Sequence, residues 1–173
     1  EGHVFVRADV ADREAMQAFG RQVDFGLTAK DYAHHRAGFP PAFFDCLSAR
    51  GYAIRGQDAL DLGTGTGTVA RGLAALGLQV TGLDPSVSLL QQAARLDSAA
   101  GVDVIYREGR AEDTGAATAS ADLVTAGQCW HWLDRPAAAQ EAARVLRPGG
   151  RLIIAHFDWL PLPGNVVEAT ERL

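Results

Sequence analysis

A glycine-rich stretch near the middle of the chain, Asp61-Leu62-Gly63-Thr64-Gly65-Thr66-Gly67-Thr68, decides the fold. It follows a short apolar run that begins at Ala59, and it precedes an amphipathic run, 69–76, that Gly77 ends. Glycine allows tight turns and lets a ligand approach backbone groups without a Cβ in the way. Ligands of open α/β sheets bind beyond the carboxyl ends of the strands. The stretch therefore predicts a strand, a ligand-binding loop and a helix.

The chain after about residue 57 alternates between expected strands and expected helices. The strands are expected at 59–62, 79–83, 102–107, 121–125 and 151–157, and the helices at 69–76, 86–96 and 134–146, with Pro148-Gly149-Gly150 stopping the last helix. Strands separated by helices of about ten residues are typical of βαβ units. The pattern predicts an α/β fold with a doubly wound, mostly parallel sheet and helices on both faces.

The first third of the chain has a different character, because it looks helical and is rich in aromatic residues. Helices are expected at 12–19, at 28–35 and from Pro40-Pro41 to Gly51. We expect residues 1–56 to form an N-terminal helical cap or lid and residues 57–173 to form the ligand-binding core. The chain lacks a starting Met and stops within a helix-like run, so we expect this core to be truncated at its C-terminus.

Composition narrows the class of protein. Of the 173 residues, 47% are hydrophobic and 21% are charged, which is typical of a chain that buries a stable core. The net charge of −5 argues against a nucleic acid or an anionic membrane as partner. No apolar run approaches the ~20 residues of a membrane span. Cys46 and Cys129 lack the spacing of a zinc site. We expect a cytoplasmic protein with free buried thiols and no metal.

An acid at the expected end of the second strand, Asp84, indicates a ribose-containing ligand, because a carboxylate there can accept hydrogen bonds from both ribose hydroxyls. Two kinds of nucleotide ligand remain open. Gly65, Gly67 and Ala70 loosely fit the dinucleotide pattern G-x-G-x-x-G/A. Asp61, however, would repel a pyrophosphate and favour a positive charge, such as the ammonium group of an amino acid. Adenosine joined to an amino acid without phosphates is S-adenosyl-L-methionine.

Three motifs in the right order resemble those of the class I S-adenosyl-L-methionine-dependent methyltransferases, and the resemblance covers roughly residues 25–159. Residues 59–67 resemble the family's first motif, 82–86 its ribose-binding strand end, and 144–154 its helix, turn and fifth strand. The likeness is to small-molecule enzymes of the trans-aconitate and ubiquinone-biosynthesis type. It implies a Rossmann-like sheet of strand order 3-2-1-4-5. The family's strands six and seven are not found, and we expect them to be missing from this chain.

The resemblance also implies how the cofactor would be held. It places the adenine at Ala111, whose backbone N–H would donate to the ring, and at Glu112, whose carboxylate would accept from the exocyclic amine. The family often has an aspartate where Arg110 stands. Tyr32 and Arg36 lie one helical turn apart, so that Arg36 would grip the methionine carboxylate and Tyr32 would cover the cofactor. A solvated arginine beside a tyrosine at the core edge is the alternative.

Polar and aromatic residues follow the expected fourth strand. Gln128 could hydrogen-bond the amino-acid part of the cofactor or the substrate. Trp130 and His131 resemble an aromatic and histidine pair of the small-molecule enzymes; the tryptophan would attract the sulfonium, and the histidine would be a candidate general base. Alternatively, these two side chains only pack and brace a loop. In the same way, Asp61 could brace the glycine loop and Asp84 could cap the next helix.

The expected function is transfer of a methyl group by in-line displacement from S-adenosyl-L-methionine to a small-molecule acceptor, which leaves S-adenosyl-L-homocysteine. A sulfonium is already an activated donor, so positioning can suffice, and no catalytic residue is assigned. Two alternatives stay open: an NAD(P)-dependent oxidoreductase, which would use the 65–70 pattern, and a noncatalytic S-adenosyl-L-methionine-binding subunit. The sequence also leaves a homodimer open.

Overall fold

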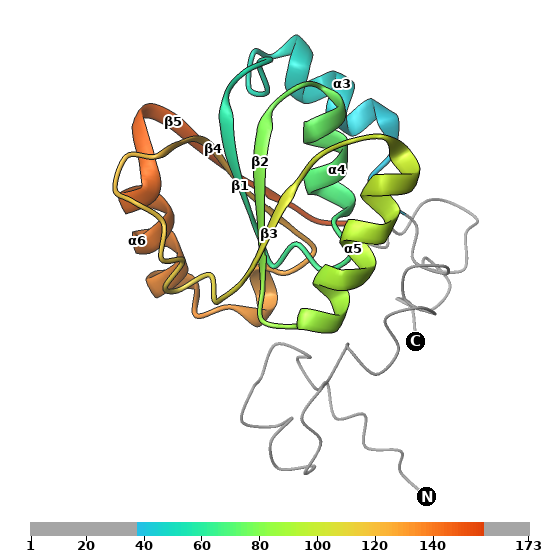
Figure 1. The fold of residues 1–173 in the computed structure, drawn as a ribbon. Helices are drawn as coiled ribbons and strands as arrows, with labels where there is room; N and C mark the ends of the chain where they lie inside the picture. Colours follow the sequence, from blue (N-terminus) through green and yellow to red (C-terminus); the bar gives the residue numbers. More distant parts are fainter. Residues whose placement is uncertain (1–37, 158–173) are drawn as a thin grey trace, which may run out of the picture.

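The computed structural model describes residues 38–157, and its elements follow the chain in the order of Figure 1. They are α3 (Pro41–Ala49), β1 (Asp58–Leu62), α4 (Thr68–Ala75), β2 (Gln79–Asp84), α5 (Val87–Ala100), β3 (Ile105–Glu108), β4 (Ala121–Gly127), the 3₁₀ turn η2 (Trp130–Trp132), α6 (Arg135–Val145) and β5 (Leu146–Ala155). The helices expected at 12–19 and 28–35, with Tyr32 and Arg36, lie outside the described residues.

The strands form one sheet of five, in the order β3-β2-β1-β4-β5, and every neighbouring pair is parallel. This confirms the doubly wound fold and the strand order that the resemblance implied. The carboxyl ends of all the strands lie at one edge, which is the lower edge in Figure 1. At that edge β1 is flanked by β2 and β4, so the segments that follow these three strands are neighbours in space.

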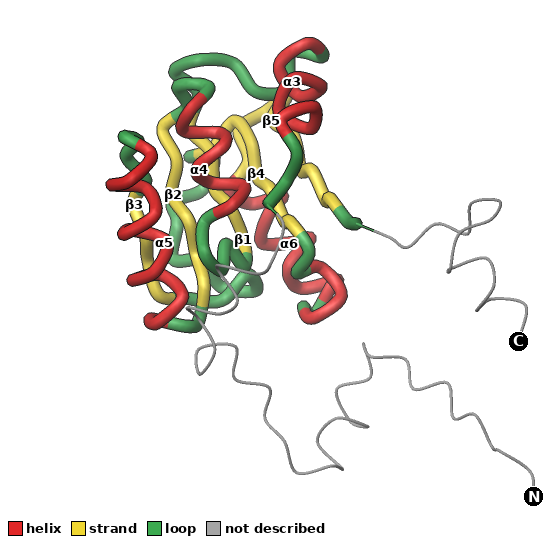
Figure 2. Tube along the Cα trace, turned by 90° about the vertical axis from the view of Figure 1, so that its right-hand side faces the viewer, coloured by secondary structure: helices red, strands yellow, loops and turns green. Residues whose placement is uncertain are grey.

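Helices cover both faces of the sheet, with α3, α4 and α5 on one face and α6 on the other (Figure 2). One buried cluster lies beneath α3 and α4 and contains Leu47, Val69, Leu73 and Val80, among others. A second cluster lies beneath α6 and includes Val145. Helix α3 was expected to belong to the N-terminal cap, but its Leu47 is buried in the same cluster as α4. This helix therefore packs as part of the core layer.

Several boundaries differ from the sequence predictions; β3, for example, begins at Ile105 instead of residue 102, and the two largest differences concern α5 and β5. Helix α5 runs on to Ala100 instead of ending near residue 96, and Asp97 in its last turn is buried. Strand β5 begins at Leu146, so the 148–150 turn signal lies inside it. An irregularity opposite Ala121 and Leu123 accommodates this stretch without breaking the strand pairing.

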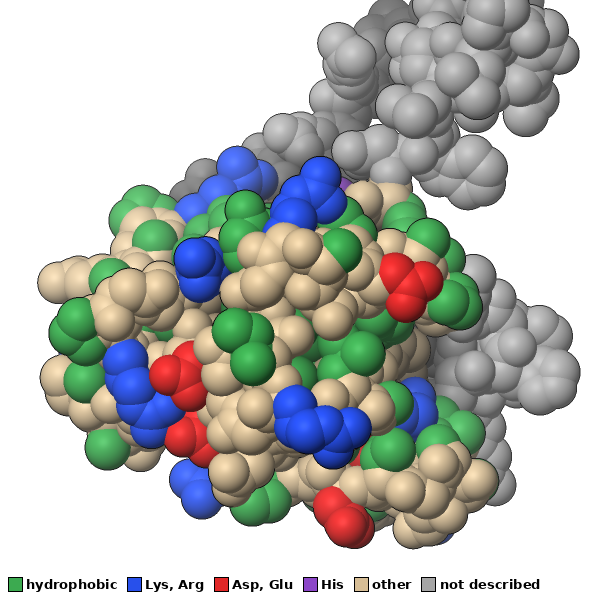
Figure 3. Space-filling view, turned by 90° about the horizontal axis from the view of Figure 1, so that it is seen from above, with side chains coloured by type: hydrophobic (Ala, Val, Ile, Leu, Met, Phe, Trp, Pro, Cys, Tyr) green, Lys and Arg blue, Asp and Glu red, His purple; other side chains and the backbone are tan. Residues whose placement is uncertain are grey.

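The amino edge of the sheet carries a small ionic network. The Arg147 guanidinium lies 2.7 Å from a carboxylate oxygen of Asp58 and 2.7 Å from one of Asp122, which joins the starts of β1, β4 and β5. The Asp58 N–H and Arg147 hold the pKa of Asp122 below its ordinary value. Figure 3 looks onto this face, where arginine and acidic side chains are interspersed. The network is partly exposed, so its contribution is to strand alignment more than to net stability.

Candidate functional site

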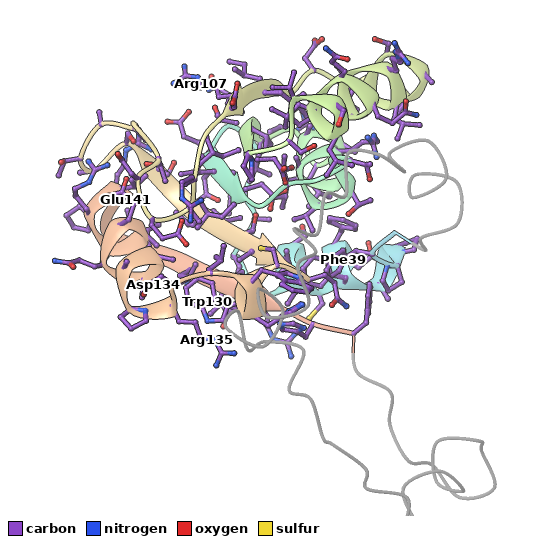
Figure 4. The ribbon with its side chains drawn as sticks, turned by 90° about the horizontal axis from the view of Figure 1, so that it is seen from below. Phe39, Arg107, Trp130, Asp134, Arg135 and Glu141 are labelled. Atoms are coloured by element: carbon purple, nitrogen blue, oxygen red, sulfur yellow. The ribbon has the colours of Figure 1, made fainter. Side chains whose placement is uncertain are left out.

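The glycine loop between β1 and α4 is the centre of the carboxyl edge, which Figure 4 views directly. Gly63, Gly65 and Gly67 have φ values of +58°, +56° and +76°, where glycine is strongly favoured. A Cβ at Gly63 would lie 2.7 Å from the Cβ of Cys129, and one at Gly67 would overlap the Tyr106 hydroxyl. A Cβ at Gly65 would meet nothing within 4 Å. Packing therefore requires glycine at positions 63 and 67, whereas the backbone at Gly65 is open to a ligand.

Asp84 ties the end of β2 to this loop. Its Oδ2 accepts a hydrogen bond from the Gly65 N–H (2.9 Å), and its Oδ1 accepts one from the Ser86 N–H (2.9 Å). Burial raises the pKa of Asp84, while the two backbone donors act against the rise. Ser86 precedes α5 and makes no cap bond with its own side chain, so Asp84 also orders the start of that helix. Each carboxylate oxygen keeps a second lone pair, which leaves acceptor capacity for ribose hydroxyls.

Asp61 lies beneath the loop and is 1% exposed. Its two oxygens accept hydrogen bonds of 2.6 Å from the hydroxyls of Thr64 and Thr125. Burial raises the pKa of Asp61 to about 6, and these hydrogen bonds limit the rise. The structure thus shows the loop-bracing role that sequence reasoning left open. A charge in this position acts on a ligand through its electrostatic field, because its oxygens face protein hydroxyls.

The start of α4 distinguishes between the two kinds of nucleotide ligand. In dinucleotide-binding folds, free backbone N–H groups at this helix start hold the pyrophosphate. Here the Ala70 N–H faces the Asp61 carboxylate and acts against the rise of its pKa. Within the loop, the Thr64 N–H donates to Leu83 O (2.9 Å) and the Gly67 N–H to Thr64 O (2.8 Å). A carboxylate at the helix start and the pairing of these loop amides both disfavour a pyrophosphate.

A buried charged cluster behind the loop was not found from the sequence. The Nε of Arg71, on α4, lies 2.7 Å from Oδ1 of Asp97, on α5, and the two side chains are 20% and 6% exposed. A second guanidinium nitrogen of Arg71 donates to Thr66 O in the loop (2.8 Å). Burial and the Asp97 carboxylate raise the pKa of the neighbouring Tyr106 hydroxyl. The cluster fixes the loop to both helices. The only local signal was an acid on an otherwise apolar helix face.

We expect Arg71→Met to lower the free energy of unfolding by about 3–5 kcal/mol, because it leaves the Asp97 carboxylate buried without its partner. Equilibrium urea denaturation of the variant measures this loss. The matched control is the double variant Arg71→Met/Asp97→Leu, which removes both charges and should recover at least half of the loss. If the double variant is as unstable as the single one, the ion pair is not the cause.

The residues assigned to adenine lie between β3 and β4. Ala111 is 5% exposed and its side chain belongs to the buried cluster beneath α6. The Glu112 carboxylate accepts a hydrogen bond from the Asp134 N–H (3.0 Å), and its other oxygen lies 3.4 Å from Nε of Arg110. The structure therefore joins Glu112 to the residue that caps α6. Its expected contact with the adenine amine would have to use the remaining lone pairs.

The segment after β4 turns sharply. Gln128 has a φ of +59°, its N–H donates to Ala155 O (2.9 Å), and its side-chain amide lies 3.4 Å from Phe157 O. Trp130 packs against the buried cluster beneath α6, and Figure 4 shows it beside the start of that helix. Trp130 therefore makes the packing contacts of the alternative, and its role beside the sulfonium stays a prediction. His131 is half-buried in η2, a turn that the sequence did not predict.

Cys129 packs against the glycine loop beside Gly63. Its thiol donates to Leu62 O (3.1 Å), and burial together with the charges of Asp61 and Asp84 raises its pKa to about 12. Cys46 and Cys129 form no disulfide with each other and are half-buried, whereas buried thiols were expected. Over residues 38–157, no cluster of His, Cys, Asp and Glu is suited to a metal ion. Nor does any helix in that range have the length and apolarity to cross a membrane.

The parallel sheet, the glycine loop after β1 and the acid at the end of β2 define a Rossmann-like domain, a fold in which ligands bind at the carboxyl edge of the sheet. Residues 60–154 match the family model described as a methyltransferase domain, and the chain belongs to this family. The match does not favour the oxidoreductase alternative.

Individual relatives agree with this family. The chain is 36% identical to an uncharacterized methyltransferase of Mycobacterium bovis over 130 residues, which is 75% of this chain and 50% of the relative. It is 35% identical to a ubiquinone biosynthesis O-methyltransferase of Xanthomonas oryzae over 123 residues, which is 70% of this chain and 51% of the relative. The chain thus spans about half the length of these relatives.

A solved structure supports the fold. It is a candidate S-adenosyl-L-methionine-dependent methyltransferase from Methanococcus maripaludis, with a TM-score of 0.66 and 21% identity. The match covers 78% of this chain and 65% of that one. At this level of identity the likeness concerns the fold alone.

Proposed function

We propose that this chain binds S-adenosyl-L-methionine at the carboxyl edge of its sheet and moves the methyl group to a small-molecule acceptor, with S-adenosyl-L-homocysteine as product. The observation that carries the proposal is the Asp84 carboxylate, which is fixed on the Gly65 N–H and retains acceptor capacity on both oxygens. An adenosine whose ribose is bound there would lie against the one loop glycine with open space over its α-carbon.

The residues proposed to hold the cofactor come from five segments of the chain. Asp84 would accept from the ribose, the loop would pack against the ligand with its backbone, and the buried Asp61 charge would favour the ammonium group. The full proposed set is Tyr32, Arg36, Asp61, Gly63, Gly65, Gly67, Asp84, Ala111, Glu112 and Gln128, with Trp130 and His131 on the acceptor side. Residues 1–56, apart from α3, would supply the lid.

When bound, the cofactor supplies a methyl carbon on a sulfonium, and the departing group is a neutral thioether. The work left to this chain is to orient both ligands and to exclude water, and positioning of this kind can lower a barrier by some ~7–11 kcal/mol. The rigid loop serves this purpose, since Asp61, Asp84 and Arg71 each hold it by hydrogen bonds. The acceptor is proposed to react through oxygen, in line with the O-methyltransferase among the relatives.

Calorimetry with S-adenosyl-L-homocysteine and with NADH tests the ligand class. The intact chain should bind S-adenosyl-L-homocysteine at least 100-fold more tightly than NADH, because the helix start that would take a pyrophosphate faces the Asp61 carboxylate. Incubation with methyl-labelled cofactor and cell extract, followed by mass spectrometry, then tests transfer. Tighter binding of NADH would favour an oxidoreductase, and binding without any labelled product would favour a noncatalytic subunit.

We expect Gly65→Ala to weaken S-adenosyl-L-homocysteine binding at least tenfold, because the new methyl group would project into the space proposed for the ligand. The matched control is Gly101→Ala, at the end of α5. Its φ of +68° and open surroundings resemble those of Gly65, so both variants should lose about 1–2 kcal/mol of stability. Only the first should lose affinity in calorimetry, and equal affinities in the two variants would place the ligand elsewhere.

A further inference from the structure

Helix α6 carries two charged residues that the proposed cofactor site does not use. Glu141 and Arg144 lie one turn apart near the end of this helix (Figure 4 labels Glu141). The Arg144 Nε donates to one carboxylate oxygen of Glu141 (2.7 Å), and a second guanidinium nitrogen donates to the other (2.7 Å). These bonds hold the pKa of Glu141 at about 2, below its ordinary value of 4.5. The two-pronged contact therefore fixes a charged carboxylate in one orientation.

This carboxylate holds the connection between β3 and β4. Residues 109–120 join the edge strand β3 to β4 and contain no helix or strand of their own. One Glu141 oxygen accepts hydrogen bonds from the Thr114 N–H (2.9 Å) and from the Thr114 hydroxyl (2.6 Å). Thr114 is 8% exposed. A single carboxylate on α6 thus satisfies both donors of a buried loop residue.

Arg144 extends the contact along the loop. Its guanidinium donates to Ala116 O (2.8 Å) and to the Thr118 hydroxyl (3.1 Å). Its backbone oxygen accepts from the Ala119 N–H (3.0 Å). The Glu141–Arg144 pair, called the loop clamp below, therefore joins the second half of the loop to the last turns of α6.

The first half of the same loop carries the residues proposed to bind adenine. At its start, the Gly109 N–H donates to Asp84 O (3.3 Å). The Asp113 N–H then donates to Arg110 O (3.2 Å), which closes a turn around the two proposed adenine residues. Thr114 follows this turn directly. One end of the turn is thus tied to the proposed ribose acid, and the other end is tied to the loop clamp.

We propose that the loop clamp sets the preference of the site for adenine, an inference that rests on the proposed binding of S-adenosyl-L-methionine. The Ala111 N–H and the Glu112 carboxylate are proposed to meet the base, and such hydrogen bonds weaken steeply when their angles are poor. Glu141 touches no part of the ligand in this proposal. It is a positioning residue that acts through Thr114 and holds the turn in its binding geometry before the cofactor arrives.

Calorimetry with S-adenosyl-L-homocysteine and with S-inosyl-L-homocysteine measures this preference. The inosyl compound has a carbonyl in place of the exocyclic amine, so the Glu112 carboxylate would face an acceptor instead of a donor. The unsubstituted chain should prefer S-adenosyl-L-homocysteine by about 30-fold or more. Glu141→Ala should prefer it by no more than about threefold, because the turn is no longer held. A merely structural role of Glu141 would lower both affinities and leave their ratio unchanged.

Two further variants accompany this measurement. Arg147→Met is the matched control, because Arg147 also joins separate elements through two ion pairs but does so at the amino edge of the sheet. It should keep the full preference, whatever stability it loses in urea denaturation. Thr114→Val removes one of the two hydrogen bonds to Glu141 and nearly preserves the shape of the side chain. It should lower the preference at least threefold, and it decides the question if Glu141→Ala does not fold.

The outcomes separate this inference from the proposed function. If S-adenosyl-L-homocysteine does not bind the unsubstituted chain, the proposed function fails, and the loop clamp inference fails with it. If it binds but is not preferred over the inosyl compound, or if a folded Glu141→Ala keeps the full preference, only the loop clamp inference is overturned. An equal loss of preference in Arg147→Met would also overturn it, because general destabilisation would then explain the loss.

Discussion

Replacing Asp84 by alanine is expected to reduce the affinity for S-adenosyl-L-homocysteine at least tenfold, measured by calorimetry at constant ionic strength. The carboxylate holds the Gly65 N–H and the Ser86 N–H, and it is the proposed acceptor for both ribose hydroxyls. Hydrogen bonds to a charged group contribute about 1.5–3 kcal/mol each, so the loss of two such bonds could exceed a hundredfold. Retention of full affinity would contradict the ribose assignment.

Because Asp84 also shapes the loop, a second measurement must separate ribose binding from loop order. The 2′,3′-dideoxy analogue of S-adenosyl-L-homocysteine lacks the hydroxyls that Asp84 would accept from. We expect the unsubstituted chain to prefer the parent ligand at least tenfold, and Asp84→Ala to bind the two ligands within threefold of each other. Asp103→Ala, which removes an exposed acid before β3, is the matched control for the change in charge and should keep the full preference. A preference that survives in Asp84→Ala would assign the ribose to another residue.

Much of this site could be predicted because its determinants are local. A strand that ends in a glycine-rich turn sets the loop, and the expected parallel order brings Asp84 beside it. The same reasoning could not decide what Asp61 touches. Its partner Thr125 lies on β4 and reaches it only through the pairing of that strand with β1. Sequence reasoning thus located the carboxylate but not its role.

The Arg71–Asp97 pair and the start of β5 were missed for a related physical reason. Arg71 and Asp97 stand on different helices, and neither residue alone shows in the sequence which charge it pairs with. Only their packing against the same side of the sheet makes them partners. In β5, residues 148–150 have the composition of a turn. They lie within the strand because the register of the pairing between β4 and β5 shifts at this point. Tertiary contacts override the local signal in both places.

The buried charge of Asp61 is unfavourable for stability. Burial raises its pKa from 3.8 to about 6, so between these two values the folded chain holds a proton that the unfolded chain has released. Stability therefore falls as the pH rises through this window, by about 3 kcal/mol in total. Well below pH 3.8 the carboxyl group is neutral in both states and this effect is absent. A group that weakens the fold at neutral pH is a candidate for a role in ligand binding.

The substitution Asp61→Asn separates the effect of the Asp61 charge on stability from its effect on ligand binding. The asparagine has nearly the same shape and carries no charge, so the variant should be at least as stable as the parent at pH 7.5, and the difference should shrink toward pH 4. Two charges about 10 Å apart interact by about 1.7 kcal/mol at an effective dielectric constant of 20. The variant should therefore bind S-adenosyl-L-homocysteine at least tenfold more weakly, whereas adenosine, which has no ammonium group, should bind within twofold. Thermal denaturation and calorimetry on one preparation measure both effects. Equal losses for the two ligands would show that Asp61 acts only by bracing the loop, and its negative charge would then have no part in selecting a cationic cofactor.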